Sequence, residues 1–293
     1  MSKATRNRAR NARERIAAQQ AASRRAEQRR RLLIVGGSVG LVIVIVVAFI
    51  LVKGFSKPSK TLGSGHLPAT VVHDITNVPT STLKTVNTGP FPSPVGQTLK
   101  AITDKPLTTA GKPEMLYIGA EYCPYCAAMR WPMAVALSRF GTFGPLTGIH
   151  STSNDVFPNT PTLTFYKQQY SSPYLTFTPV EAENGQRQPL QQPTKSQQAL
   201  WAKYDTSPQG GQSFPFMDFG NKAVITGPLY LPQNLRGLTW AQVASKLKNP
   251  HDPVAQEIGG SANYITAAIC KMTGNKPASV CTAAPIPAIE AKL

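Results

Sequence analysis

The chain has 293 residues, a length that allows one or two globular units with appendages. It carries 31 Lys and Arg against 14 Asp and Glu, but eleven of these basic residues and only two of the acidic ones precede Leu32. The excess positive charge therefore belongs largely to an N-terminal tail and says little about the folded part. An even count of four cysteines in a chain of this size is compatible with an oxidising compartment.

Residues 1–31 form a basic tail that is rich in Ala, Arg, Gln and Glu and contains no Pro or Gly. The tail has almost no large apolar side chain and hence no face to bury, so it should be solvated. Nucleic acid is one candidate partner for its charges. The tail has no Phe, Tyr or Trp to stack on bases, however, and contact with anionic lipid headgroups explains the same charges. We predict lipid contact rather than nucleic-acid binding.

An uncharged apolar run extends over residues 32–52, between Arg31 and Lys53. At ~1.5 Å per residue, a helix over this run is about 31 Å long, which matches a hydrocarbon core of roughly 30 Å. The run is too long for the apolar part of a cleaved signal peptide, and no small-residue cleavage site follows it. We predict an uncleaved single-pass transmembrane helix. The arginines before it place the N-terminus in the cytoplasm and everything after Lys53 outside the cell membrane.

Residues 53–97 are rich in Pro, Gly, Ser and Thr, which predicts an extracytoplasmic stalk that could lie against the domain, and residues 98–293 form the predicted globular domain. Hydrophobic periodicity, turn residues and helix caps predict the following elements within the domain. In chain order they are a buried strand at 115–118, a helix at 124–140, a strand at 146–151, a hairpin of 163–167 and 174–180, a helix at 195–204, a hairpin of 216–219 and 223–226, a helix at 239–248, and one or two helices within 251–273. The Ala- and Pro-rich C-terminal tail is predicted to be weakly structured.

Cys123-Pro124-Tyr125-Cys126 stands between the predicted buried strand and the predicted helix. The first cysteine falls at the helix N-terminus, where unpaired backbone N–H groups and the positive end of the helix dipole favour a thiolate. The second lies one helical turn further on, near enough to close a small disulfide. This pattern predicts thiol–disulfide exchange, with Cys123 as the nucleophile and Cys126 as the resolving thiol.

Two other interpretations of the pair remain open, namely a structural disulfide and half of a metal site. Zinc needs four ligands, but Cys270 and Cys281 have the wrong spacing for a second CxxC, and the four histidines show no paired spacing. We therefore expect no resident metal and no cofactor. Outside the cytoplasm, Cys270 and Cys281 are expected to form a stabilising disulfide, since the chain between them is short.

The segment Tyr122–Cys126 after a strand resembles the active site of thioredoxin-fold oxidoreductases, with a dipeptide of the glutaredoxin type between its cysteines. A longer pattern also resembles a prokaryotic family of unknown function whose members are membrane-anchored and thioredoxin-like. That pattern comprises Gly119–Trp131, Ser213–Asn221 and Thr266–Cys270. The resemblance spans roughly residues 70–281 and implies an α/β, thioredoxin-like fold with redox competence, but no substrate.

Thioredoxin folds place a cis-proline opposite the CxxC, ahead of a strand hairpin and a last helix. Two prolines compete for this position, Pro161 and Pro215. Pro215 has both a predicted strand (146–151) and a predicted helix (195–204) before it and a hairpin after it, so we choose Pro215. This choice implies an insertion at about 152–193, between the second strand and the cis-proline hairpin, and makes the last predicted helices a C-terminal extension. The residues expected to support the two cysteines are Pro124, Tyr125, Phe214 and Pro215.

These expectations describe a membrane-tethered, extracytoplasmic thiol–disulfide oxidoreductase. It would act on thiols or disulfides of exported proteins and would need a redox partner to recycle it. The alternatives are a non-catalytic binding module with a structural disulfide and a metal-delivery protein that uses the CxxC. Two further residues, Glu121 and His150, could approach the site. The simpler expectation is that Glu121 is exposed to solvent and that His150 makes a structural hydrogen bond.

Overall fold

The computed structural model describes residues 64–90, 99–205 and 212–293. The predicted basic tail, the predicted transmembrane helix and both ends of the predicted stalk lie outside the described residues. The chain divides into a unit of Met1–Lys60 and a unit of Thr61–Leu293, and all described residues belong to the second unit. Within this described part, no helix combines the length and the apolar composition needed to cross a bilayer.

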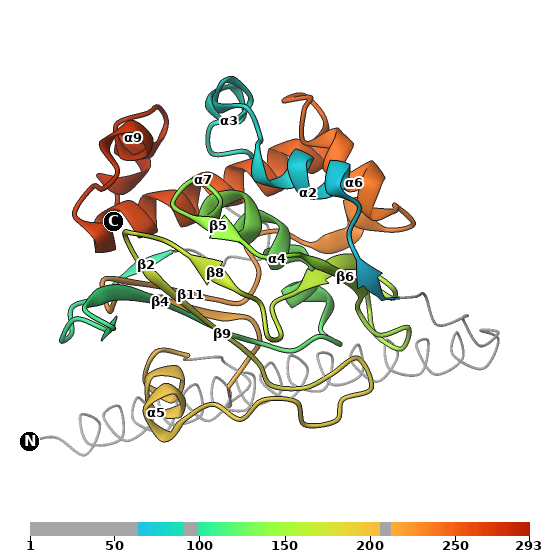
Figure 1. Cartoon of the computed structure of the whole chain (residues 1–293), viewed down its shortest axis with the longest axis horizontal. Coiled ribbons are helices and arrows are strands. Elements are labelled where there is room, and N and C mark those ends of the chain that lie inside the picture. The colour runs from blue at the N-terminus through green and yellow to red at the C-terminus, as the bar shows by residue number, and fades with distance from the viewer. Residues whose placement is uncertain (1–63, 91–98, 206–211) are drawn as a thin grey trace, which may run out of the picture. The chain divides into compact units, whose positions relative to one another are not determined.

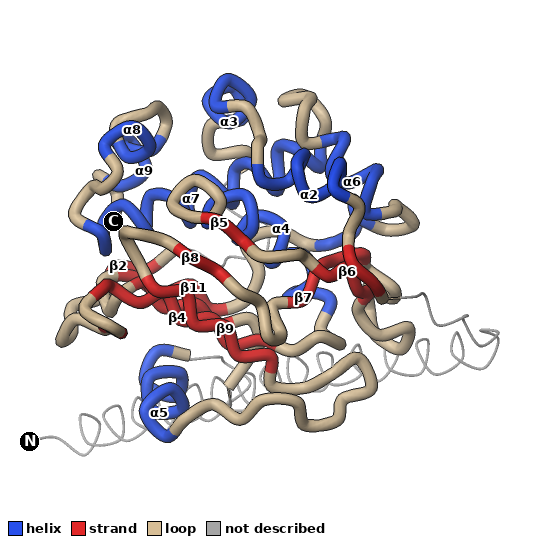
Figure 2. The backbone as a smooth tube through the Cα atoms, viewed as in Figure 1, coloured by secondary structure: helices blue, strands red, loops and turns tan. Residues whose placement is uncertain are grey.

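A mixed sheet lies at the centre of the described unit (Figures 1 and 2). In spatial order its strands are β2 (Lys100–Ala101), β11 (Ala223–Thr226), β10 (Phe216–Phe219), β4 (Lys112–Gly119) and β9 (Thr176–Glu181), while β3 (Thr108–Thr109) pairs with the start of β4. β4 runs antiparallel to β10, with Ile118 opposite Phe216, and parallel to β9, with Gly119 opposite Glu181. The fold is therefore of the α/β class, as the sequence predicted.

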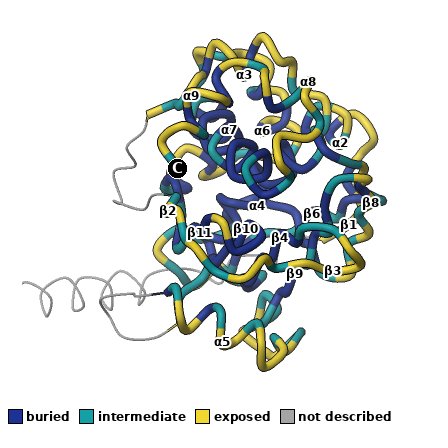
Figure 3. Tube along the Cα trace, turned by 90° about the vertical axis from the view of Figure 1, so that its left-hand side faces the viewer, coloured by how far each residue is buried: buried dark blue, intermediate teal, exposed yellow. Residues whose placement is uncertain are grey.

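β4 is buried on both of its faces, which explains the uninterrupted apolar sequence of the predicted strand. Met115 and Tyr117 belong to the larger core, together with residues of α4 (Pro124–Leu137) and α7 (Pro253–Thr273). Leu116 and Ile118 belong to a smaller core on the other face, which α5 (Lys195–Tyr204) covers with Trp201. Figure 3 shows α4 and α7 on one side of the sheet and α5 on the other.

The strands between α4 and β9 lie outside the central sheet. They are β5 (Thr142–Phe143), β6 (Thr147–His150), β7 (Pro161–Thr164) and β8 (Tyr170–Ser171). β6 pairs with β7 and with β1 (Gly65–His66), and β5 pairs with β8. The predicted strand at 146–151 thus exists, but it is not a neighbour of β4.

This arrangement corrects two predictions. The parallel partner of β4 is β9, which falls inside the predicted insertion (152–193), so the additional strands precede the second central strand instead of following it. The predicted hairpin of 163–167 and 174–180 does not form, because β7 pairs with β6 and β9 pairs with β4. Short β-rich segments specify an extended backbone but not the partner strand, which is chosen by contacts that are distant in sequence.

Residues 64–90, assigned from the sequence to a stalk, pack tightly against the domain. They form β1, α2 (Ala69–Thr76) and α3 (Thr80–Val86) and contribute to the larger core through Leu67, Val71, Ile75 and Leu83. Their backbone approaches α7 so closely that a Cβ on Gly260 would lie 2.6 Å from the carbonyl oxygen of Thr88. The globular unit therefore begins well before residue 98. The prediction missed this because each helix is short and offers only two or three apolar side chains.

The C-terminal third is mostly helical, and several local predictions are confirmed there. The predicted hairpin is β10–β11, and the predicted helix at 195–204 is α5. Thr239 and Gln242 form a capping box at the start of α6 (Trp240–Lys246), which follows a 3₁₀ turn, η1 (Pro232–Leu235). The tail is more ordered than predicted, because α8 (Ala278–Cys281) is joined to α7 by the Cys270–Cys281 disulfide and α9 (Ile286–Glu290) buries Ile286 and Ile289.

Candidate active site

The two cysteines of the CxxC lie where β4 leads into α4. β4 ends at Gly119, and Cys123 then serves as the N-cap of α4, with its backbone N–H donating to the carbonyl of Ala120 at 3.2 Å. Pro124 occupies the first helical position, where its missing N–H leaves no donor unpaired. A strand end, a tight turn and a Pro-started helix thus fix the position of Cys123.

The thiols of Cys123 and Cys126 are both free and differ in burial. The Cys123 sulfur accepts a hydrogen bond from the backbone N–H of Cys126 at 3.3 Å, the interaction expected of an N-cap side chain. The exposed fraction of Cys123 is 6 %, whereas Cys126 is completely buried. The structure thus brings the two predicted residues together, with Cys123 toward the surface and Cys126 behind it.

Electrostatics separate the two thiols further. Burial by itself would raise the pKa of the Cys123 thiol, but hydrogen bonds from Cys126 and the positive charge of Arg130 outweigh it, so the pKa is lowered. Burial raises the pKa of Cys126 well above its usual range, and the hydrogen bond to Cys123 and the negative charge there raise it further. Cys123 is consequently the thiol that ionises first.

A completely buried ion pair lies beneath the CxxC. Arg130, one turn after Cys126 on α4, donates from Nε and Nη2 to the two carboxylate oxygens of Glu181 at 2.8 and 2.6 Å. Its Nη2 also donates to the carbonyl of Ala120 at 2.7 Å. Neither side chain of the pair is exposed. Burial would lower the pKa of Arg130, but the Glu181 carboxylate more than compensates, so this pKa is raised and Arg130 stays charged.

A hollow of about 610 Å³ opens in front of Cys123. It is lined by Tyr122, Cys123, Pro124, Tyr125, Asp155, Glu183, Arg187, Trp201, Gln212, Ser213 and Phe214. The Phe214 ring stacks on Trp201 at 5.1 Å between centroids and meets the edge of Tyr122 at 6.5 Å. Tyr125 meets Phe157 at 5.9 Å. The lining around Cys123 therefore combines aromatic side chains with polar and charged ones, and it includes Phe214 and Tyr125, which the sequence predicted as supporting residues.

One ion pair spans the rim of this hollow. Arg187, in the loop after β9, donates to Asp155, in the loop before β7, at 2.9 Å. The Arg187 guanidinium also lies 3.8 Å from the centroid of the Tyr122 ring, within cation–π range. Both partners of the pair are partly exposed, so their attraction is screened by solvent and contributes little to stability.

Backbone geometry shows which of the two candidate prolines, Pro161 or Pro215, follows a cis peptide bond. The Phe214–Pro215 peptide bond is cis, and β10 begins at the next residue. Pro161 instead begins β7, where it lies opposite His150 in a small sheet, and its carbonyl accepts the Trp131 indole N–H at 2.9 Å. Pro215 is therefore the cis-proline that precedes the hairpin, as the sequence predicted.

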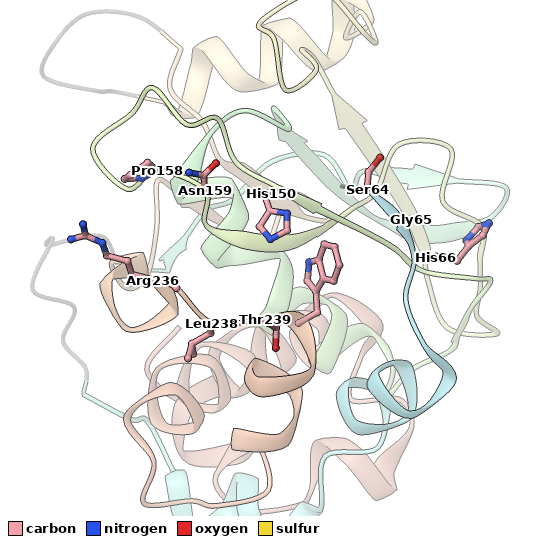
Figure 4. Close-up of a pocket in the computed structure, with 11 residues that line it drawn as sticks. Ser64, Gly65, His66, His150, Pro158, Asn159, Arg236, Leu238 and Thr239 are labelled. Carbon is pink, nitrogen blue, oxygen red and sulfur yellow. The ribbon is translucent and has the colours of Figure 1, made fainter. Parts of the chain in front are cut away.

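Two other residues that the sequence placed near the site have different surroundings. Glu121 is half-buried, accepts a hydrogen bond from the Thr164 hydroxyl at 2.6 Å, and has its pKa raised by burial. His150 packs against Trp240, with 4.8 Å between ring centroids, in a separate pocket of about 720 Å³ that does not include Cys123 (Figure 4). His150 therefore does not line the hollow in front of Cys123.

A family model described as a domain of unknown function, DUF929, matches residues 98–271, which is more than half of the chain. The chain belongs to this family. No curated protein and no solved structure matches it significantly. The matched range of the DUF929 domain contains Cys123, Cys126 and Pro215, but it excludes the N-terminal helices α2 and α3 and the second cysteine of the disulfide, Cys281.

The structure of this DUF929 protein adds site residues that the sequence analysis missed. They are Tyr117, Arg130, Glu181 and Arg187. The sequence did contain a signal for Arg130, because it is the single charged residue in the otherwise apolar helical segment 127–137. Among the described residues, no cluster of three or more His, Cys, Asp or Glu side chains has the arrangement of a metal site.

Proposed function

We propose that this protein is a thiol–disulfide oxidoreductase that is tethered to the membrane and acts outside the cytoplasm through Cys123 and Cys126. The observation that carries the proposal is the asymmetry of the two thiols. Cys123 lines the hollow and has a lowered pKa, whereas Cys126 is buried behind it and has a raised pKa. Exchange chemistry needs a nucleophile and a resolving thiol that differ in this way, while a permanent disulfide does not.

The fold in this proposal is thioredoxin-like. It is supported by the parallel unit β4–α4–β9, by the CxxC at the N-terminus of α4, and by the antiparallel hairpin β10–β11 after the cis-proline. The strands β5 to β8 are then an insertion between α4 and β9. The helices after β11, including the disulfide-linked α7 and α8, are a C-terminal extension.

The proposed reaction proceeds by two exchanges. The thiolate of Cys123 attacks a substrate disulfide, whereupon one substrate sulfur leaves as a thiolate and the other stays bonded to Cys123. Cys126 then loses its proton and attacks the Cys123 sulfur, which releases the second substrate sulfur and leaves an oxidised Cys123–Cys126 pair. The same steps in reverse donate a disulfide to a substrate dithiol. The direction depends on the reduction potential of the pair and on the partner that recycles it.

The proposed location is the outer side of the cell membrane. Residues 32–52 would be the single span, and the basic tail would contact anionic lipid on the cytoplasmic side. Substrates are then the thiols or disulfides of exported proteins. The Cys270–Cys281 disulfide is compatible with such an oxidising compartment.

The decisive experiment measures the reduction potential of the Cys123–Cys126 pair in the full chain, purified in mild detergent and equilibrated with glutathione. Exchange catalysts lie at about −120 to −270 mV, and a value in this range supports the proposal. Alkylation kinetics provide an independent check, because Cys123 should react rapidly near neutral pH after mild reduction. Cys123→Ser is the matched control and should abolish the rapid phase, whereas Cys126→Ser should retain it.

One observation favours a second candidate function, a binding module in which the CxxC is a permanent disulfide. Only 6 % of Cys123 is exposed, which is little for a nucleophile that must meet a protein substrate. A potential below about −300 mV, together with slow alkylation, would match a structural disulfide and would replace the enzyme by this module.

A further inference from the structure

Two buried polar atoms behind the CxxC have no hydrogen-bond partner among the described residues. They are the hydroxyl oxygen of Tyr117 and Nη1 of Arg130, and both side chains are completely buried. An unpaired polar group in a protein interior is costly, and each case needs an explanation. A phenylalanine at position 117 would fill nearly the same space without this cost, so the hydroxyl calls for a role beyond packing.

The position of the Tyr117 hydroxyl suggests that role. Tyr117 and Gly119 point to the same face of β4, toward α4, because side chains alternate along a strand. A Cβ added to Gly119 would overlap the Tyr117 hydroxyl oxygen and would lie 3.1 Å from the Cys126 sulfur. The hydroxyl and the Cys126 sulfur therefore both border the space that a side chain at position 119 would occupy.

Cys126 must lose its proton in the resolving step, although its pKa is raised well above its usual range. Several titratable or charged groups interact electrostatically with it: Cys123 and Arg130 from α4, Tyr117 from β4, and Tyr122 from the turn before α4. Glu181 is paired with Arg130, and burial together with the Cys123 charge opposes a second thiolate. The Tyr117 hydroxyl is a donor without a partner among the described residues, and it shares the space at Gly119 with the Cys126 sulfur, while the unpaired Nη1 of Arg130 adds positive charge.

We infer that Tyr117 is a positioning residue for the resolving step: its hydroxyl donates a hydrogen bond to the Cys126 sulfur as that sulfur becomes a thiolate, with Arg130 as the supporting charge. In this step Cys126 gives its proton to solvent, the Cys123–Cys126 bond forms, and the bond between Cys123 and the substrate sulfur breaks. The substrate leaves as a thiolate and is thereby reduced. The inference rests on the proposed function, since without exchange at Cys123 there is no mixed disulfide to resolve.

The test uses the reduced full chain in mild detergent and the chromogenic aromatic disulfide DTNB in stopped flow. Attack by Cys123 releases a first thionitrobenzoate, and attack by Cys126 on the resulting mixed disulfide releases a second. Tyr117→Phe removes only the hydroxyl. We expect it to slow the second phase about tenfold at about pH 7 and to move the midpoint of its pH profile upward by about one unit, because a hydrogen bond to a charged group is lost. The first phase should stay within about twofold of the unchanged protein.

Tyr230→Phe is the matched control. Tyr230 is another completely buried tyrosine in contact with α4, but its hydroxyl donates to the carbonyl of Ala128 at 2.7 Å, away from the cysteines. The Tyr230→Phe variant should show both phases, and their pH profiles, unchanged. Cys126→Ser should abolish the second phase and so identifies it.

The possible failures are distinguishable. A missing first phase in the unchanged protein would contradict the proposed function itself. A normal first phase with superimposable second-phase pH profiles for Tyr117→Phe and the unchanged protein would overturn the role of Tyr117 and leave the oxidoreductase intact. An equal shift in Tyr230→Phe would also overturn it, because any buried hydroxyl that packs against α4 would then have the same effect.

Discussion

We predict that folding stability depends on pH through Asp218, and that this dependence is opposite in sign to that of most carboxyl groups. Asp218 lies in β10, is completely buried, and accepts a hydrogen bond from the Asn221 N–H at 2.7 Å through Oδ1, while Oδ2 has no partner among the described residues. Burial raises its pKa from 3.8 to about 7, with additional repulsion from Glu114 and Asp104. The folded protein therefore holds this proton more tightly than the unfolded chain does.

The sign and the magnitude follow from proton linkage. Because the pKa is higher in the folded state, the stabilisation is fully present below the unfolded value of 3.8 and is lost as the pH rises through about 7. At about 1.4 kcal/mol per unit of pKa difference, lowering the pH from about 7.5 to about 5.5 should add about 2 kcal/mol to the free energy of unfolding. Asp218→Asn keeps the shape and the Asn221 contact but cannot titrate, so it should lack this gain.

The measurement is urea unfolding of the full chain in mild detergent, followed by tryptophan fluorescence at several pH values. The quantity of interest is the difference in free energy of unfolding between the unchanged protein and Asp218→Asn, because other titrating groups cancel in it. This difference should change by about 2 kcal/mol in favour of the unchanged protein between about pH 7.5 and 5.5. A difference that stays constant over this range would show that Asp218 is already ionised at pH 5.5 and would refute the reasoning.

Two further predictions concern covalent and ionic links in the core. Replacing both Cys270 and Cys281 by Ala removes a disulfide with a sequence separation of 11, and it should lower the free energy of unfolding by about 3 kcal/mol through loop entropy. The unchanged protein with that disulfide reduced should match the double variant. A loss of less than about 1 kcal/mol would argue against this mechanism. Arg130→Met leaves Glu181 buried without its partner and should cost about 3–5 kcal/mol, whereas Arg130→Met combined with Glu181→Met should recover most of that loss. Equal losses in the single and double variants, by urea unfolding, would contradict the second prediction.

Several elements could be predicted from the sequence because their causes are local. The capping box of Thr239 and Gln242 and the hairpin turn at Gly220 and Asn221, both with positive φ, are each specified by a few adjacent residues. The buried strand β4 was recognisable because it is apolar on both faces. The cysteine pair and its place at a helix N-terminus followed from the same local context.

The pairing of strands was not accessible in this way. The sequence identified a β-rich segment at 174–180, but only the tertiary structure made it β9, the parallel neighbour of β4. Parallel pairing requires a long connection, and nothing within a short strand specifies a partner that lies more than fifty residues away in the chain, as β9 lies from β4. The same reason explains why residues 64–90 were taken for a stalk, since their few apolar side chains find their core only against α4, α6 and α7, which follow much later in the chain.

For the candidate site, the sequence by itself located the cysteine pair at a helix N-terminus and favoured Pro215 over Pro161 as the cis-proline before the hairpin. The tertiary structure alone decided what surrounds them. Tyr117, Arg130 and Glu181 come from three different elements, and only the packing of α4 on β4 and β9 brings them beneath Cys126. A helix N-terminus can be recognised from neighbouring residues, but the electrostatic environment of a buried thiol depends on charges that are remote in the chain and close in space.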